Sequence, residues 1–381
     1  MKIIGIIAEY NPFHLGHHYQ IKKIKELYPN SLIIAIISTN FTQRGDISII
    51  NKWDKTKICL EYGIDLIVEL PTIYATQSAD IFAKGALQIL NELKIDTLVF
   101  GSESNDVKSL IKLAKIQLND KTYQSKVKEY LDTGINYPSA MSKALKDITT
   151  IKIDKPNDLL GLSYIKEIIK QNYQITPIAI QRTNDYHSKS IDAPIINATL
   201  IRELYLAKKD ITPYIPPKVN THLYPTASIN NAYNYLLLRI ITNNECLSNY
   251  LTVDEGIEKR ILANINKSET WQELTEHIKT KRYTYNKINR MLIHILLGIK
   301  KEDNNNSNYL RILGFNSQGQ AHLNKIKKHL NLELYTNYKP NRNSALDLEY
   351  KSTYVYSLII NDKTLAEKEF QNKPIIYKKD K

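Results

Sequence analysis

The chain has 381 residues, of which 43% are hydrophobic and 24% are charged, a composition that excludes a disordered chain and allows two domains. Its two cysteines are too few for a disulfide framework or a zinc cluster. No apolar run approaches the roughly 18 residues of a membrane span, and the N-terminal run is too short for a signal peptide. We therefore expect a soluble, cytoplasmic protein that does not enter the membrane.

Positive charge is concentrated in the second part of the chain. Lysine and arginine number 52 against 39 aspartate and glutamate, a net charge of +13, and residues 211–381 hold 25 of the basic and 16 of the acidic residues. A basic excess of this kind favours a polyanionic partner such as nucleic acid. The abundance of lysine, asparagine, isoleucine and tyrosine leaves open that genome base composition contributes to the excess.

The first 210 residues alternate short apolar runs with helical patterns. The apolar runs predict strands at residues 2–8, 31–38, 65–70, 97–100 and 178–180. Helical patterns cover residues 17–28, a segment around Trp53, residues 78–93, several segments up to residue 146, a segment after Pro156, and residues 198–207. Strands that alternate with helices predict an α/β fold with a Rossmann-like, doubly wound parallel sheet, which binds ligands at the carboxyl ends of its strands.

The character of the sequence changes near residue 211. Pro213, Pro216 and Pro217 mark a boundary, and most of the sequence that follows has helical patterns, apart from a polar turn at residues 303–308. We therefore predict an α/β domain at residues 1–210 and a mainly helical, basic region at residues 211–381.

Two histidines stand directly after the first predicted strand, in the run His14-Leu15-Gly16-His17. A helix that begins at such a turn offers free backbone N–H groups and a positive dipole end to a phosphate. Gly16 lets a nucleotide approach the backbone, and two imidazoles can stabilise the charge of a departing pyrophosphate. The pattern favours nucleotide activation, although two histidines three residues apart are also common in cores and on surfaces.

A second candidate segment, Ile196-Asn197-Ala198-Thr199-Leu200-Ile201-Arg202, opens the helix predicted at residues 198–207. Thr199 could cap this helix, and Arg202 follows close to the same end. Because a cation is unfavourable at a helix N-terminus unless an anion offsets it, Arg202 indicates a phosphate site. A capped helix with a solvated arginine is the alternative.

These two segments together resemble the H-x-G-H nucleotidyltransferase superfamily, which pairs the histidine motif with a later I-S-S-T-x-I-R segment. This chain keeps Thr199 and Arg202 but has Asn197 and Ala198 in place of the two serines, so the serine contacts stay open. Nine blocks, the first of which contains the histidine motif, are spread over nearly the whole chain and are similar to the bacterial tRNA(Met) cytidine acetate ligase family. These blocks are residues 9–17, 41–45, 52–53, 68–71, 100–103, 155–161, 186–188, 281–284 and 311–315.

The resemblance implies a two-step, ATP-dependent ligase. Acetate would attack the α-phosphate of ATP, pyrophosphate would leave, and the acetyl-adenylate would acylate the wobble cytidine of elongator tRNA(Met) to N4-acetylcytidine. Residues 1–210 would be the nucleotidyltransferase-like, ATP-binding catalytic domain, and residues 211–381 the tRNA-binding region. Mg²⁺ is expected with the triphosphate, and no residue is assigned to a resident metal.

The resemblance also assigns site residues. His14, His17 and Arg202 would be catalytic, with the histidines holding phosphates and Arg202 neutralising the leaving pyrophosphate. The nucleotide would be bound by the turn after the first strand and by residues at the ends of later elements. This set is Ile7, Ala8, Glu9, Tyr10, Asn11, Pro12, Phe13, His14, Gly16, His17, Gly101, Asn157 and Arg182.

A basic segment at residues 279–301 contains no acidic residue and is the candidate RNA surface. A basic stripe beside a buried apolar stripe is suited to docking a phosphate backbone, and a solvated basic face is the alternative. Tyr283 and Tyr285 could stack on unpaired bases or pack in the core. The basic stripe at helical spacing consists of Lys287, Arg290, His294 and Lys301.

Four other residues keep two interpretations each. Arg44 could contact nucleotide or RNA, or belong to a solvated loop. Glu69 could be a base or a buried, hydrogen-bonding carboxylate. Lys57 could reach the site or be exposed, and His187 could be structural.

Two other functions stay open from the residues. A small-molecule adenylyltransferase acting on a phosphorylated metabolite would use the same motif but leave AMP on its product, and the basic C-terminal region argues against it. A non-catalytic RNA-binding protein could keep an old nucleotide fold, and the intact histidine motif with Arg202 argues against that. The sequence does not fix the oligomeric state or, without the resemblance, the choice of acetate and of the RNA base.

Overall fold

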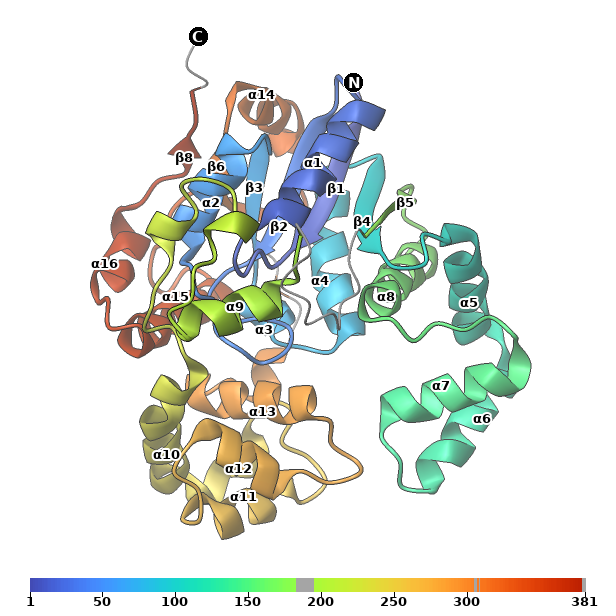
Figure 1. Cartoon of the computed structure of the whole chain (residues 1–381), viewed down its shortest axis with the longest axis vertical. Coiled ribbons are helices and arrows are strands. Elements are labelled where there is room, and N and C mark those ends of the chain that lie inside the picture. The colour runs from blue at the N-terminus through green and yellow to red at the C-terminus, as the bar shows by residue number, and fades with distance from the viewer. Residues whose placement is uncertain (183–194, 305–306, 308, 379–381) are drawn as a thin grey trace.

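The computed structural model describes residues 1–182, 195–304, 307 and 309–378 of the chain (Figure 1). In this part of the chain, eight strands form a sheet in the order β5-β4-β1-β2-β3-β6-β7, with β8 paired to β6. His187 and the block at residues 186–188 lie outside the described residues. The strands are β1 (Ile3–Ala8), β2 (Leu32–Ser38), β3 (Leu66–Leu70), β4 (Thr97–Ser102), β5 (Thr176–Gln181), β6 (Tyr309–Phe315), β7 (Glu333–Tyr335) and β8 (Ile375–Ile376).

Strands β1 to β5 are parallel. Strands β2 and β3 lie on one side of β1, and β4 and β5 lie on its other side, so the order of the strands reverses between β1 and β4. In this register Gly5 of β1 lies beside Ile34 of β2 and Leu98 of β4. Every residue of β2 and β3 is buried, as expected for strands covered by helices on both faces. The prediction of a Rossmann-like, doubly wound α/β fold is confirmed.

Helices pack on both faces of this sheet. α1 (Leu15–Leu27) and α2 (Lys52–Glu61) connect β1 to β2 and β2 to β3, and α4 (Ala79–Glu92) connects β3 to β4. Since the chain crosses back over β1 between β3 and β4, right-handed crossovers place α4 on the face opposite α1 and α2 (Figure 1). α8 (Pro156–Lys170) packs against α4. The other helices before residue 211 are α3 (Thr72–Ala75), α5 (Val107–Asn119), α6 (Lys121–Asp132), α7 (Tyr137–Ile148) and α9 (Ala198–Leu206).

The chain after residue 211 first forms a helical cluster and then returns to the sheet (Figure 1). β6 pairs antiparallel with β3, and β7 and β8 pair with β6, so the sheet is mostly parallel but mixed. Strands from both sides of residue 210 share one sheet, so the sheet does not mark a domain boundary there. The division at residue 210 stays a prediction. The helices of this part are α10 (Tyr233–Thr242), α11 (Ile257–Ile265), α12 (Trp271–Ile278), α13 (Tyr285–Leu297), α14 (Ser317–Ile326), α15 (Ser344–Ile359) and α16 (Thr364–Gln371). None of the described helices is both long and apolar enough to cross a bilayer.

A buried network of five charged groups joins the C-terminal helices to the sheet. Nζ of Lys52 lies 2.8 Å from Oε2 of Glu69 and 2.6 Å from Oε1 of Glu369. The guanidinium of Arg311 contacts the other oxygen of Glu369 at 2.5 Å and Oε2 of Glu69 at 3.5 Å. Glu349 completes the network, 3.7 Å from the Lys52 ammonium. All five side chains are buried, so α2, β3, β6, α15 and α16 meet at one point.

The charges of this network nearly balance. Burial, with the charge of Glu349, raises the pKa of Glu69 to about 7. Although burial opposes ionisation of Glu369, the charges of Arg311 and Lys52 lower the pKa of that carboxyl to about 2. Close to neutral pH, Glu369 is therefore ionised beside the two cations, and Glu69 is partly protonated.

Removing one cation from this network is expected to destabilise the fold. Arg311→Met leaves Glu369 buried without its guanidinium partner, and we expect the free energy of unfolding to fall by about 3–5 kcal/mol in urea denaturation at pH 7. Lys23→Met, which removes an exposed ion pair with Glu26, is the control and is expected to keep the wild-type midpoint. Equal midpoints for Arg311→Met and the wild type would contradict this account of the network.

Candidate active site

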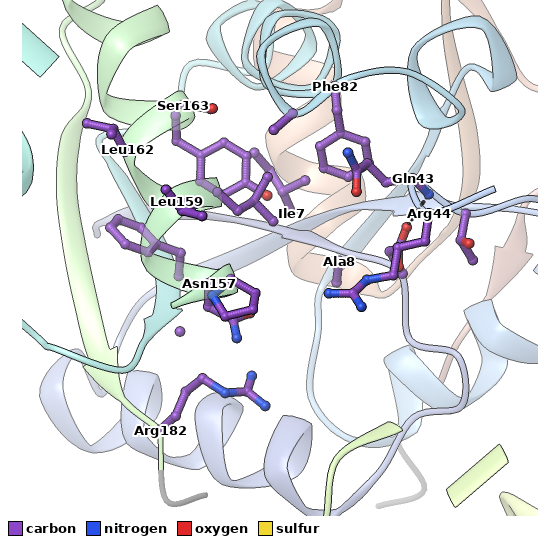
Figure 2. A pocket seen from close by; sticks show the side chains of 18 of the residues that line it. Ile7, Ala8, Gln43, Arg44, Phe82, Asn157, Leu159, Leu162, Ser163 and Arg182 are labelled. Atoms are coloured by element: carbon purple, nitrogen blue, oxygen red, sulfur yellow. Dashed lines mark hydrogen bonds between the residues drawn. The ribbon is translucent and has the colours of Figure 1, made fainter. Parts of the chain in front are cut away.

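A pocket of about 840 Å³ opens at the carboxyl ends of β1, β4 and β5, beside the point where the strand order reverses. Its walls come from the turn after β1, the loop after β2, helices α7 and α8, and the first two turns of α9 and α13. Figure 2 shows Arg182 and Asn157 extending from one side toward the same space as Arg44 from the other. Open doubly wound sheets bind ligands at this switch point.

His14 and His17 pack together at the start of α1, with ring centroids 3.7 Å apart. His14 caps the helix, because its Nδ1 accepts the backbone N–H of Gly16 at 3.0 Å. Nδ1 of His17 accepts the backbone N–H of His14 at 3.2 Å. Since both Nδ1 atoms accept hydrogen bonds, the neutral form of each ring carries its proton on Nε2. Two Nε2–H donors therefore lie beside the pocket.

The environment keeps both imidazoles neutral. Burial, followed by the positive charges of Arg182 and Arg202, lowers the pKa of His14 to about 3. Burial and the nearby His14, Arg182 and Lys55 lower the pKa of His17 well below its usual value. Before a ligand binds, these rings act as neutral donors and the arginines and lysine supply the positive charge.

Gly16 is required by the imidazole of His14. A Cβ at position 16 would lie 2.8 Å from Cε1 and 3.0 Å from Nδ1 of His14, closer than carbon atoms normally approach. Any larger residue would push the ring out of its capping position. The glycine therefore fixes the histidine pair and does more than let a ligand approach the backbone.

The turn between β1 and α1 is held by Asn11. Its Nδ2 donates to the carbonyl oxygen of Ile47 at 3.0 Å, and its Oδ1 accepts the backbone N–H of Ile49 at 2.8 Å. Tyr10 before it has a left-handed backbone, with φ of 46°, and its side chain is buried. The shape of this turn thus depends on the loop after β2.

A buried lysine that the sequence analysis did not identify joins two strand ends below the pocket. Nζ of Lys55 in α2 donates to the carbonyl oxygens of Glu9, Ser38 and Thr39 at 2.7, 2.8 and 3.3 Å. Burial lowers the pKa of its ammonium to about 8. These carbonyls end β1 and β2, so Lys55 sets their separation. Its only signal in the sequence is its place among the apolar residues of α2.

Arg202 joins α9 to the turn after β1. Asn197, rather than Thr199, caps α9 by accepting a backbone N–H of its first turn at 2.9 Å. Arg202 extends back along the helix, and its Nη1 donates to the carbonyl oxygen of Asn11 at 2.8 Å. Its Nη2 lies 3.4 Å from Oγ1 of Thr199 and 3.8 Å from a carboxylate oxygen of Asp46. The guanidinium is thus held at the pocket wall.

Three later residues of the predicted set reach the pocket from β4, α8 and β5. The backbone N–H of Arg182 continues the sheet by donating to the carbonyl of Ser102 at 2.9 Å. Asn157, in the first turn of α8, donates from Nδ2 to Oε1 of Glu103 at 2.6 Å. A Cβ at Gly101 would lie 3.4 Å from Cγ of Arg182, an ordinary van der Waals contact. All three line the pocket.

Most of the predicted set therefore gathers at one place. Pro12 and Phe13 do not line the pocket, and Phe13 is buried in the core. Arg44 does line it (Figure 2), whereas Lys57 is exposed and pairs with Asp54 of its own helix. Glu69 belongs to the buried charge network and is a structural carboxylate.

The predicted basic stripe, whose last member Lys301 lies beyond the end of α13, divides between the surface and the interior. Lys287 and Lys301 are accessible. Arg290 turns to the pocket, where its Nη1 donates to the carbonyl oxygen of Gln43 at 3.0 Å. His294 is fully buried and contacts backbone carbonyls on both sides of it. The prediction of one solvent-facing stripe is wrong for these two residues, because α13 packs against the loops at the end of the sheet.

The two tyrosines of this segment also differ. Tyr283 is 4% exposed and donates its hydroxyl to the carbonyl of Asp254 at 2.8 Å, so it packs in the core. Tyr285 is 52% exposed, with the Lys279 ammonium 5.3 Å from its ring. Only Tyr285 of this pair presents its ring to solvent.

Over nearly its whole length, the chain is similar to known proteins of about the same length. The HIGH Nucleotidyl Transferase family matches residues 1–372. The tRNA(Met) cytidine acetate ligase of Bacillus subtilis (strain 168) is 34% identical, over 100% of this chain and 98% of that protein. The ligase of the same name from Caldicellulosiruptor saccharolyticus is 35% identical over 98% of each chain. The crystal structure of Thermotoga maritima TmcAL bound with alpha-thio ATP has a TM-score of 0.88 and 29% identity, and the match covers 99% of both chains.

The protonation of the histidine pair can be tested directly. In the ligand-free protein, the Cε1–H signals of His14 and His17 are expected not to titrate between pH 5.5 and 8, because burial lowers the pKa of His14 to about 3 and that of His17 well below its usual value. The measurement is an NMR pH titration of histidine-labelled protein, with His14→Gln and His17→Gln variants to assign the signals. A midpoint between pH 6 and 7 for either ring would contradict the neutral pair.

Proposed function

The chain belongs to the HIGH Nucleotidyl Transferase family, and we propose that it is an ATP-dependent tRNA(Met) cytidine acetate ligase. It joins acetate to AMP with release of pyrophosphate, and then transfers the acetyl group to N4 of the wobble cytidine in elongator tRNA(Met). Similarity over the full length to ligases named for this substrate supports the proposal. A tRNA substrate supports a cytoplasmic location for this activity.

In the first step, an acetate oxygen attacks the α-phosphorus of ATP and pyrophosphate leaves. His14 and His17 donate from Nε2 to phosphate oxygens, and Arg202 offsets the charge of the leaving pyrophosphate. Transfer at phosphorus depends mainly on positioning and charge, so neutral donors and a fixed guanidinium suffice. ATP enters as its magnesium complex, as triphosphates usually do.

The nucleotide lies across the ends of β1 and β4. The backbone of residues 7–11, with Gly16, lines one side of it. Gly101, Asn157 and Arg182 line the other side. Their common position at the switch point of the sheet, on the walls of one pocket, supports this placement.

In the second step, the tRNA approaches along the helical region. Asn286 and Arg290 of α13 belong to the pocket wall, and Lys281, Arg282 and Lys287 extend the basic surface outward from them. A phosphate backbone bound on this surface brings the anticodon loop to the pocket. Residues 211–381 thus supply the tRNA-binding region, with α13 as its part nearest the site.

One observation carries the proposal: the histidine–arginine group and the basic helix α13 share a single pocket. An adenylyltransferase for a small metabolite needs only the first of these. An RNA-binding protein without activity needs only the second. A ligase that activates a carboxylate and delivers it to RNA needs both in one place.

The test is transfer of labelled acetate by the purified protein to unmodified elongator tRNA(Met), followed by nucleoside analysis. We expect ATP-dependent label in N4-acetylcytidine, and a rate about 10²–10³-fold lower for His17→Ala, because one donor to the phosphates is lost. Lys57→Ala is the control and is expected to keep the wild-type rate.

Two outcomes would contradict the ligase. Labelled AMP attached to a phosphorylated small acceptor, with no label in RNA, would indicate an adenylyltransferase. Tight tRNA binding without any ATP-dependent product, unchanged in His17→Ala, would indicate a non-catalytic RNA-binding protein.

Gly16→Ala tests the role of the capping histidine. The added Cβ displaces the His14 ring, and we expect acetate-dependent exchange of labelled pyrophosphate into ATP to fall at least about tenfold. Gly134→Ala adds a Cβ at a left-handed position outside the pocket, with φ of 82° and no atom within 4 Å, so it controls for backbone strain that does not displace His14. Equal exchange rates in Gly16→Ala and the wild type would show that the ring position is unimportant.

A further inference from the structure

One carboxylate of the pocket has no part in the scheme above. Glu9 follows directly after β1, at the strand end where the order of the sheet reverses, and lines the pocket. Its Oε1 accepts the backbone N–H of Gln43 at 2.6 Å. Within the described part of the chain, its Oε2 makes no hydrogen bond or ion pair. The carboxylate is thus anchored through one oxygen, and the other is available at the pocket.

The anchor of Glu9 is itself held by the helical region. The same Gln43 residue that donates to Glu9 accepts, through its carbonyl oxygen, the guanidinium of Arg290 in α13 at 3.0 Å. Gly45 allows the loop after β2 to pack closely against α13, since a Cβ at this position would lie 2.5 Å from the backbone nitrogen of Arg290. The helix that faces the RNA therefore fixes the orientation of Glu9.

The other acidic residues that line the pocket are placed differently. Oδ1 of Asp80 lies 2.8 Å from the Lys166 ammonium and accepts the Ser163 hydroxyl at 2.8 Å. Asp154 lies exposed in the loop before α8. Of the three acidic side chains, that of Glu9 is the one that directly follows β1. It is held through Oε1, and its Oε2 has no partner in the described residues.

The second step of the reaction requires a proton acceptor. As N4 of cytidine bonds to the acetyl carbon, the bond from that carbon to the AMP oxygen breaks, AMP leaves as an anion, and N4 must lose a proton. The lone pair of this amine is delocalised into the ring, so removing the proton as the bond forms lowers the barrier. The imidazoles of His14 and His17 are unsuited to this role, because their Nδ1 atoms are occupied and their Nε2 atoms carry protons.

We propose that Glu9 is the general base of acetyl transfer, with Oε2 accepting the N4 proton of the target cytidine as AMP leaves. This assignment depends on the proposed function and adds a catalytic residue to its second step. The nucleotide contact of residue 9 is through the backbone, whereas the base is its side chain. The two roles can therefore be separated by a substitution that changes only the carboxylate.

Glu9→Gln is that substitution, since the amide oxygen can still accept the Gln43 N–H. The first step is measured as acetate-dependent exchange of labelled pyrophosphate into ATP. The second step is measured as single-turnover acetylation of tRNA from synthetic acetyl-adenylate. We expect the ratio of transfer to exchange to fall about 10²-fold or more, the usual contribution of a general base. Asp80→Asn, which changes another pocket carboxylate, is expected to keep the wild-type ratio.

Each other result overturns the assignment. An equal fall of both steps in Glu9→Gln would show that the side chain acts in folding or nucleotide binding. Unchanged transfer would show that the departing phosphate takes the proton. A wild-type protein without acetate-dependent exchange would overturn the proposed function, and the assignment of Glu9 with it.

Discussion

Two buried ammonium groups, one turn apart on α2, fix the centre of this molecule. Lys52 joins the carboxylates of Glu69 and Glu369, and Lys55 joins the carbonyl oxygens that end β1 and β2. A buried charge is unfavourable unless its partners are complete, so α2 is stable only where both sets of partners meet. Glu369 belongs to α16 and also binds Arg311 of β6. Through this carboxylate, the C-terminal part of the chain is held to α2 and to the sheet.

In the site at these strand ends, the groups that carry positive charge differ from the groups that donate neutral hydrogen bonds. Arg182 and Arg202 supply positive charge, while burial keeps His14 and His17 neutral as Nε2–H donors. Charging the two rings before a ligand binds would add repulsion among cations already held in the pocket wall. In our proposal a single carboxylate, from Glu9, then handles the proton of the second step, so cations, donors and base are distinct groups.

Local patterns predicted the first five strands and the histidine and arginine motifs, because each is encoded within a few consecutive residues. β6 escaped prediction since Arg311 interrupts its apolar run, and the carboxylate that neutralises it comes 58 residues later. Lys52 and Lys55 resemble a solvated helix face until their tertiary partners are known. Arg290 and His294 were expected in solvent for the same reason, and packing of α13 against the sheet loops covers them. Charge alone does not reveal burial when the partners are distant in sequence.

The most direct test of a ligase built on this pocket is a quench-flow experiment with acetate and ATP labelled with ³²P at the α-phosphate. Without tRNA, we expect labelled acetyl-AMP to accumulate on the protein in stoichiometric amount. Added elongator tRNA(Met) should then convert it to labelled AMP at the rate at which N4-acetylcytidine appears. Acetyl-AMP that never forms, or that forms and is not discharged by this tRNA, would contradict the proposed two-step reaction.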